Sequence, residues 1–211
     1  MKRYPTTPLP IKLAAAAVLV LVVGWWTLDH GNRAGNERRL SAIASEIAGR
    51  SVKVHCPGPI GRVFAKDSVV EGFVRFDADG RPADETKLQA GSCDELDALA
   101  EGRRGKELEC TARAGILCGR HGRELATAVD VVTHESFHLQ GIMDEARTEC
   151  SALQTMARTA QRLGATADEG AALARGQFAE TYPLLPDGYR SAECADGKAF
   201  DLRPDDPRFP S

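Results

Sequence analysis

The stretch Thr133-His134-Glu135-Ser136-Phe137-His138-Leu139-Gln140 decides how the second half of this chain folds and what it holds. It contains the pattern HExxH. On a helix, residues four apart share a face, so both imidazoles can reach one metal ion. Glu135 then lies beside that ion, where it can take a proton from a bound water and later return it to a leaving amine. Zinc suits this chemistry because it lowers the pKa of its water towards about 7.

Apolar spacing predicts a helix over residues 123–140 that carries the motif. Projected at 100° per residue, His134 and His138 fall nearly opposite the packing face. A buried structural histidine would instead lie on that face. The pattern therefore favours a metal site, and the alternative is a solvated helix face that carries two histidines by chance. The packing face consists of Leu125, Ala128, Val129, Val132, Ser136 and Leu139.

A second helix is predicted over residues 144–163, directly after Gly141. Two antiparallel helices joined by so short a turn bring the start of the second alongside the end of the first. Glu149 projects near the centre of the second helix's apolar face. A carboxylate buried there needs a cation or hydrogen bonds to offset its desolvation. The alternative is that Glu149 pairs with an arginine from elsewhere.

These arguments predict a zinc site bound by His134, His138 and Glu149. Glu145 projects at the flank of the same face, and we expect it to hydrogen-bond a ligand or to be the alternative third ligand. Asp144 projects towards solvent and is predicted to cap the second helix.

Residues 134–149 resemble the zincin metallopeptidases. The resemblance implies zinc on the two histidines of HExxH, with Glu135 as general base. Glu145 and Glu149, spaced as ExxxE, look like the glutamate helix of the gluzincins, although the linker between the two motifs is shorter than most gluzincins have.

Two other likenesses start from the same motif. His134 to Asp144 also looks like the metzincin pattern HExxHxxGxxH, with Asp144 in the position of the third ligand, but no Met-turn is recognisable. The whole chain is similar to uncharacterised bacterial membrane-anchored proteins with an HESxHxxGxxDEAxxEC signature. That similarity implies no particular activity.

The N-terminus is predicted to anchor the chain in a membrane. Leu13 to Leu28 is uncharged and, as a helix, just long enough to cross a hydrocarbon core. The basic residues that precede it should stay in the cytoplasm, which places the rest outside. The expected organisation is a cytoplasmic segment (1–12), a transmembrane anchor (13–28), a linker and juxtamembrane helix (29–50) and an extracytoplasmic zincin-like domain (51–211). The alternative is a cleaved signal peptide.

Six cysteines follow this segment, and none forms a CxxC pair. An even number of cysteines in an exported domain predicts up to three disulfides, with fifteen possible connectivities. Buried free thiols are the alternative. The candidates are Cys56, Cys93, Cys110, Cys118, Cys150 and Cys194.

Charge excludes one class of partner. The chain has a formal net charge of −3, and 24 basic against 29 acidic side chains remain after residue 30. Nucleic-acid binding needs a basic field to displace counterions from phosphates, and this domain lacks one. The expected partners are a peptide or protein substrate and the membrane.

The predicted fold is α+β: a small β-sheet in the first half packed on a helical zinc-binding second half, with one N-terminal transmembrane helix. Strands are expected over 51–56, 69–76 and 86–89, and a further helix over 93–101. The predicted function is a membrane-anchored, extracytoplasmic zinc metallopeptidase with Glu135 as general base. The alternative is a non-catalytic, disulfide-linked module that binds a cell-envelope partner and whose metal site is structural or vestigial.

Overall fold

The computed structural model describes residues 14, 33–58, 72–206 and 208–210. The chain divides into two compact units, Met1–Gly35 and Asn36–Ser211, and the fold described below is that of the second. The predicted anchor at 13–28 lies outside the described residues, apart from Ala14. Among the helices that are described, none combines the length and apolarity needed to cross a membrane.

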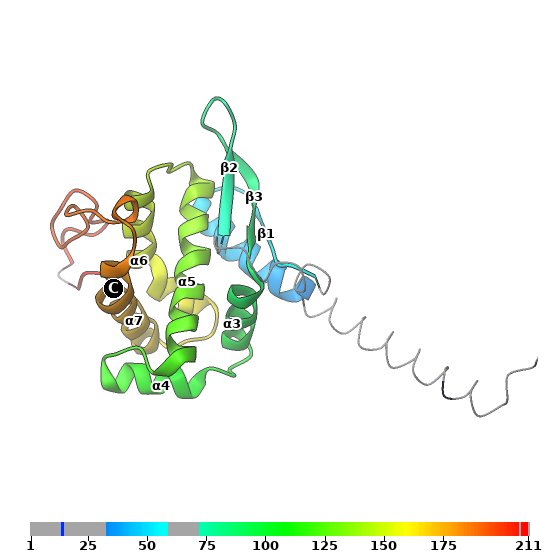
Figure 1. Cartoon of the computed structure of the whole chain (residues 1–211), viewed down its shortest axis with the longest axis vertical. Coiled ribbons are helices and arrows are strands. Elements are labelled where there is room, and N and C mark those ends of the chain that lie inside the picture. Colours follow the sequence, from blue (N-terminus) through cyan, green and yellow to red (C-terminus); the bar gives the residue numbers. More distant parts are fainter. Residues whose placement is uncertain (1–13, 15–32, 59–71, 207, 211) are drawn as a thin grey trace, which may run out of the picture. The chain divides into compact units, whose positions relative to one another are not determined.

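The domain is built around the motif-bearing helix α5 (Gly119–Gln140), which contacts the sheet and most of the other helices (Figure 1). Its apolar face lies in the main hydrophobic core with Leu125, Val129, Val132 and Leu139, which are all fully buried. The other helices are α3 (Ala90–Ala100), α4 (Gly105–Ala114), α6 (Glu145–Arg162) and α7 (Ala167–Gly176), and residues 33–48 are also helical.

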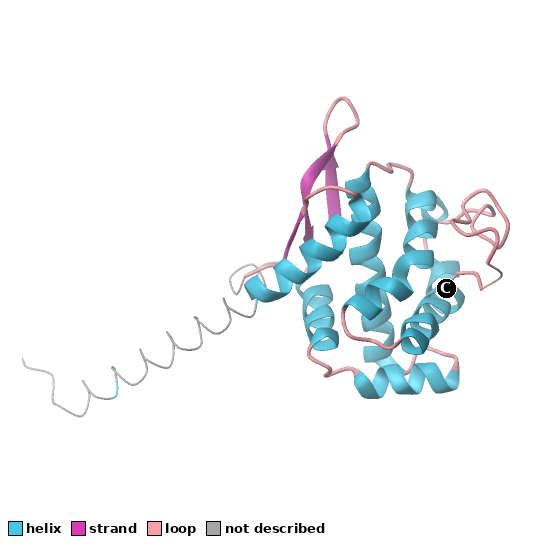
Figure 2. Cartoon of the chain, turned by 180° about the vertical axis from the view of Figure 1, so that it is seen from behind, coloured by secondary structure: helices cyan, strands magenta, loops and turns pink. Residues whose placement is uncertain are grey.

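A small sheet packs against α5 with the strand order β1-β3-β2. Strand β1 (Lys53–His55) is parallel to β3 (Pro82–Leu88), and β2 (Gly72–Phe76) is antiparallel to it. The strands predicted over 51–56 and 69–76 therefore form, although residues 69–71 lie outside the described part, and the third strand is longer than predicted. Seen from behind, the helical residues 36–48 run across the domain beside the strands (Figure 2).

The α+β prediction is wrong, because the described chain is mostly helical and the sheet is a minor element. Two helices that the prediction omitted, α4 and α7, account for part of the difference. Helix α7 begins with a capping box, in which Thr166 accepts from the Glu169 N–H and the Glu169 carboxylate accepts from the Thr166 N–H. This is a local start signal that outweighs the two glycines in its ten residues.

The prediction of disulfides is confirmed, since all six cysteines are paired. Cys56–Cys93 joins the end of β1 to α3, Cys110–Cys118 joins α4 to the start of α5, and Cys150–Cys194 joins α6 to the C-terminal segment. From Tyr182 on, that segment has only short 3₁₀ turns, at Tyr182–Leu184 (η2) and Asp187–Tyr189 (η3). Gln154 of α6 fastens it by donating to the Phe200 carbonyl and accepting from the Leu202 N–H.

Candidate metal centre

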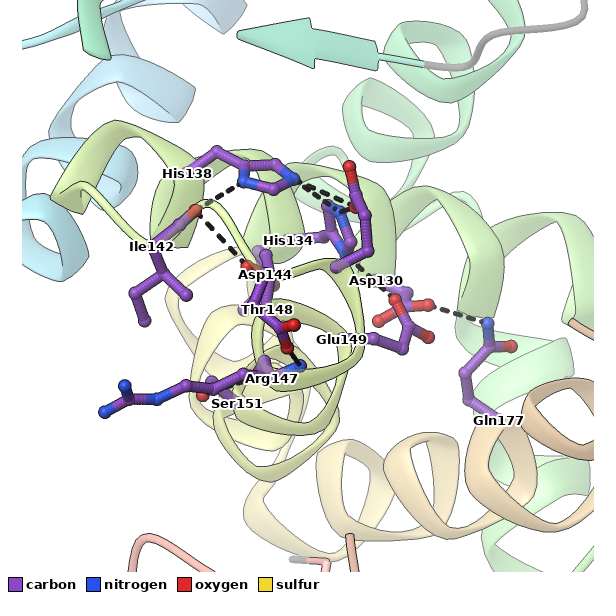
Figure 3. Close-up of polar contacts among 12 residues, drawn as sticks. Asp130, His134, His138, Ile142, Asp144, Arg147, Thr148, Glu149, Ser151 and Gln177 are labelled. Atoms are coloured by element: carbon purple, nitrogen blue, oxygen red, sulfur yellow. Dashed lines mark hydrogen bonds and ion pairs between the residues drawn. The ribbon is translucent and has the colours of Figure 1, made fainter. Parts of the chain in front are cut away.

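Three potential ligand atoms meet at the end of α5. The Nε2 atoms of His134 and His138 are 3.0 Å apart, and Glu145 Oε2 lies 3.1 Å from each of them. Both histidines are more than 90% buried, so the alternative of a solvated helix face is excluded. The histidines come from successive turns of α5 and Glu145 is the first residue of α6 (Figure 3 shows the two imidazoles).

In each imidazole, the hydrogen bond of Nδ1 determines whether Nε2, the nitrogen that faces the candidate centre, carries a proton. His138 Nδ1 lies 2.7 Å from the Ile142 carbonyl, and His134 Nδ1 lies 2.9 Å from the Glu149 carboxylate (Figure 3). These oxygens accept hydrogen bonds, so each Nδ1 carries a proton, and in the neutral ring Nε2 then presents its lone pair. Two lone pairs and a carboxylate oxygen therefore converge on one point.

Such a group of acceptors is stable only with a positive charge among them. Ligand atoms about 2.0–2.2 Å from one cation stand roughly 3–3.5 Å apart, which matches the separations observed here. Without a metal, a proton has to supply the charge. Burial disfavours the His134 imidazolium, but hydrogen bonds to Glu145 and Glu149 outweigh it and raise the pKa of His134 to about 10. The described residues thus form a group of two histidines and a glutamate that can hold a metal ion.

The structure gives the two glutamates of α6 the opposite placement from the sequence prediction. Glu145 Oε2 belongs to the group of ligand atoms, whereas Glu149 contacts His134 from behind, through Nδ1. The reason is the register of the antiparallel helices: Glu145 lies level with both histidines, and Glu149 lies one turn further along. Within the part of the chain that the structure describes, Glu149 pairs with His134 and not with an arginine. Asp144 caps α6 as predicted, by accepting from the Arg147 N–H at 2.7 Å.

The Glu135 side chain contacts the sheet and is not one of the three candidate ligands. Its carboxylate lies 3.4 Å from the Thr86 hydroxyl on β3, and its side chain packs directly against Gly72 on β2. Burial raises the pKa of Glu135 to about 7, while the neighbouring His134 lowers it and Glu145 raises it further. The carboxylate is therefore close to the candidate centre without belonging to it, which is the placement expected for a base.

Two aromatic residues border the candidate centre. Tyr189 of η3 stacks on His134 with ring centroids 5.9 Å apart, and Phe76 of β2 meets His138 edge-on at 6.0 Å. Burial and the charges of Glu145, Glu135 and Glu149 raise the pKa of Tyr189. The segment that carries Tyr189 offers no periodic pattern, so only the three-dimensional fold brings it to the site.

A second acidic group, made of Glu95, His121 and Glu124, lies elsewhere on the domain. Arg104 already pairs with Glu95 through two hydrogen bonds, at 2.6 and 2.7 Å. This guanidinium neutralises Glu95, and we interpret the group as an ion-pair network. His55 lies 3.3 Å from Glu85 on the neighbouring strand, outside the candidate centre.

Comparison of the chain with protein-family models, curated proteins and solved structures finds no match. Any assignment of function therefore depends on the chemistry of the site itself.

Proposed function

We propose that this domain is a zinc-dependent peptide hydrolase that works outside the cytoplasm. The observation that carries the proposal is the convergence of His134 Nε2, His138 Nε2 and Glu145 Oε2 beside a buried carboxylate, Glu135, that is not part of the group. A set of two histidines and one glutamate is a ligand set of catalytic zinc sites.

The ligand count supports catalysis over a structural metal site. Structural zinc sites are closed by four protein ligands, whereas catalytic sites keep a position open for water or substrate. Among the described residues the group offers three ligand atoms. When bound, zinc would supply a Lewis acid that polarises the scissile carbonyl and lowers the pKa of water.

The residues of the chain then have separate tasks. Glu135 takes a proton from the attacking water and returns it to the leaving amine. Glu149 holds the His134 imidazole in the tautomer whose Nε2 faces the centre. Tyr189 keeps its hydroxyl protonated at neutral pH, so that it can donate a hydrogen bond to the substrate's carbonyl oxygen.

The sheet offers a place for an extended substrate. In the described sheet β2 is an edge strand, and its residue Phe76 lies against His138. A peptide can add to such an edge through main-chain hydrogen bonds, which give affinity without demanding one sequence. The half-exposed Phe73 on the same strand adds an apolar contact.

The disulfides support the proposed compartment. Three pairs, spread from β1 to the C-terminal segment, persist in oxidising surroundings and are rare in the cytosol. Alkylation of the unreduced, denatured protein from its native host should therefore label none of the six cysteines. Labelling of all six would contradict this location.

The function is tested on the full chain with four proteins: wild type, Glu135→Gln, His138→Ala, and His55→Ala as a matched control histidine outside the centre. We expect about one zinc per chain in wild type, Glu135→Gln and His55→Ala, and loss of zinc in His138→Ala. We expect cleavage of casein by wild type and His55→Ala only. Equal zinc content in wild type and His138→Ala would refute the metal site, and cleavage by Glu135→Gln at the wild-type rate would refute the base.

A further inference from the structure

Behind His134 lies a buried chain of polar side chains that the proposed mechanism does not use. Glu149 accepts from His134 Nδ1 with one carboxylate oxygen, and its side chain lies within hydrogen-bonding reach of Asp130. Asp130 accepts in turn from Gln177 Nε2 at 3.0 Å (Figure 3). Asp130, Glu149 and Gln177 are each at least 94% buried.

Three buried acceptor atoms in this chain lack a donor among the described residues: Asp130 Oδ1, Glu149 Oε1 and Gln177 Oε1. The first two belong to neighbouring carboxylates. Two adjacent carboxylates, both ionised and out of water, repel each other strongly. A single proton shared between them removes the repulsion and satisfies both oxygens.

The neighbours decide which carboxyl group holds the proton. Glu149 has to stay ionised on the side of His134, because it accepts the Nδ1 proton there. Asp130 forms no ion pair among the described residues, although the charge of His134 acts on it and favours its ionisation. Its second oxygen already has the Gln177 amide as donor. Burial and the charge of Glu149 raise the pKa of Asp130 well above its usual range, in the same direction. Asp130 is therefore the donor and Glu149 the acceptor.

We propose that Asp130 is a positioning residue, which, held by Gln177, donates a hydrogen bond to Glu149 and so keeps the Glu149 carboxylate against Nδ1 of His134. This inference rests on the proposed function, since its effect reaches the metal through His134. Gln177 starts a π-helical turn, Gln177–Thr181, directly after α7. Such turns are rare and are often found at functional sites, and this one aims the amide at Asp130.

The role predicts a measurable change in metal affinity. Partners that orient a ligating histidine typically contribute 10- to 100-fold to metal affinity. Asp130→Ala removes the donor to Glu149 and leaves the Gln177 amide without its acceptor. We therefore expect zinc affinity to fall by about 10- to 100-fold. Asp130→Asn replaces both bonds, because its amide oxygen accepts from Gln177 and its amide nitrogen donates to Glu149. We expect it to stay within about threefold of wild type.

The experiment compares these two variants with wild type in the full chain, with Asp97→Ala as a control carboxylate on α3. Zinc affinity is measured by competition with a chromophoric chelator, and the His134 ring nitrogens are observed by ¹⁵N NMR in the zinc-free chain. Far-ultraviolet circular dichroism checks folding. If Asp130→Ala does not fold, Gln177→Leu takes its place, because it releases Asp130 without removing a carboxyl group, and the same loss of affinity is expected.

The Asp130→Asn variant distinguishes a role of Asp130 as a hydrogen-bond donor to Glu149 from a role as a negative charge. Loss of affinity in Asp130→Asn equal to that in Asp130→Ala would overturn the inference, and so would wild-type affinity in Asp130→Ala or, if that variant does not fold, in Gln177→Leu. If wild type itself binds no zinc, the proposed function fails and the NMR spectrum still decides the inference. His134 must then show a slowly exchanging Nδ1–H in wild type and Asp130→Asn that is lost in Asp130→Ala or its replacement, and identical spectra would overturn it.

Discussion

Gly72→Ala should slow peptide hydrolysis by about two orders of magnitude and leave the metal site intact. A Cβ atom at Gly72 would lie 2.8 Å from Glu135 Cγ, 2.9 Å from Oε1 and 3.0 Å from Cδ. Carbon atoms in contact stand about 3.5–4.0 Å apart, so the Glu135 side chain has to move by roughly 1 Å. A displacement of that size at a reacting group costs about 100-fold in rate, which is about 2.7 kcal/mol of transition-state stabilisation.

The assay measures the rate of cleavage of a fluorogenic peptide mixture and the zinc content of the same samples by elemental analysis. Gly91→Ala serves as the matched control, because a Cβ there meets nothing within 4 Å. We expect full zinc content in both variants and slow cleavage in Gly72→Ala alone. Cleavage by Gly72→Ala within threefold of wild type, with its zinc retained, would refute the assignment of Glu135 as the base that works from this position.

Three further outcomes follow from the contacts described. Glu145→Ala should weaken zinc binding by about 100- to 1000-fold and change the visible spectrum of the cobalt-substituted protein. Glu149→Ala should weaken zinc binding by about 10- to 100-fold and leave that spectrum unchanged. A spectrum that changes in Glu149→Ala and stays unchanged in Glu145→Ala would contradict the placement of the glutamates. Replacing both Cys150 and Cys194 by serine should lower the free energy of unfolding by about 4 kcal/mol, given their sequence separation of 44; an unchanged urea midpoint would contradict this. Burial opposes ionisation of Glu95, but the hydrogen bonds from Arg104 prevail and lower the pKa of Glu95. The ion pair's stabilisation, about 1–2 kcal/mol, is thus complete above pH 4.5 and is lost as the pH falls below that value. The difference in unfolding free energy between wild type and Glu95→Gln should therefore shrink between pH 5 and 3, and a constant difference would contradict the ion pair.

The sequence was sufficient for the local part of the candidate site. His134 and His138 are four residues apart on one helix, so their common face follows from helix geometry alone. The cap at Asp144 depends only on the three residues that follow it, and it forms. These features need no information from distant parts of the chain.

The roles of the two glutamates needed information that helix projection does not contain. Glu149 projects to the centre of the apolar face and is indeed buried, 4% exposed, but its burial comes from packing against His134 and Asp130. Which glutamate lies beside both histidines depends on the register between α5 and α6. The turn at Gly141 sets this register, and helix projection does not give the geometry of that turn. Burial alone therefore selected the partner of a ligand instead of the candidate ligand.

Long-range neighbours of the site had no usable signal. Gly72, Thr86 and Tyr189 come from three separate segments and contact the motif only after the fold has formed. The underestimated helical content has a different cause, because the capping box at Thr166 is a signal that the sequence itself contains. Local signals of this kind can be found without a structure, whereas the three contacts cannot.

The position of the three ligand atoms along the chain has a consequence for folding. All three come from residues 134–145, on consecutive helices joined by one short turn, so closing that loop costs little entropy. The helical hairpin can thus bring its ligands together early and capture a metal ion before the sheet and the C-terminal segment are in place. The proposed base, Glu135, and Tyr189 are held at the centre by contacts of long sequence separation. Metal binding is therefore expected to precede the gain of catalytic activity. A trapped folding intermediate should carry zinc while it is still inactive.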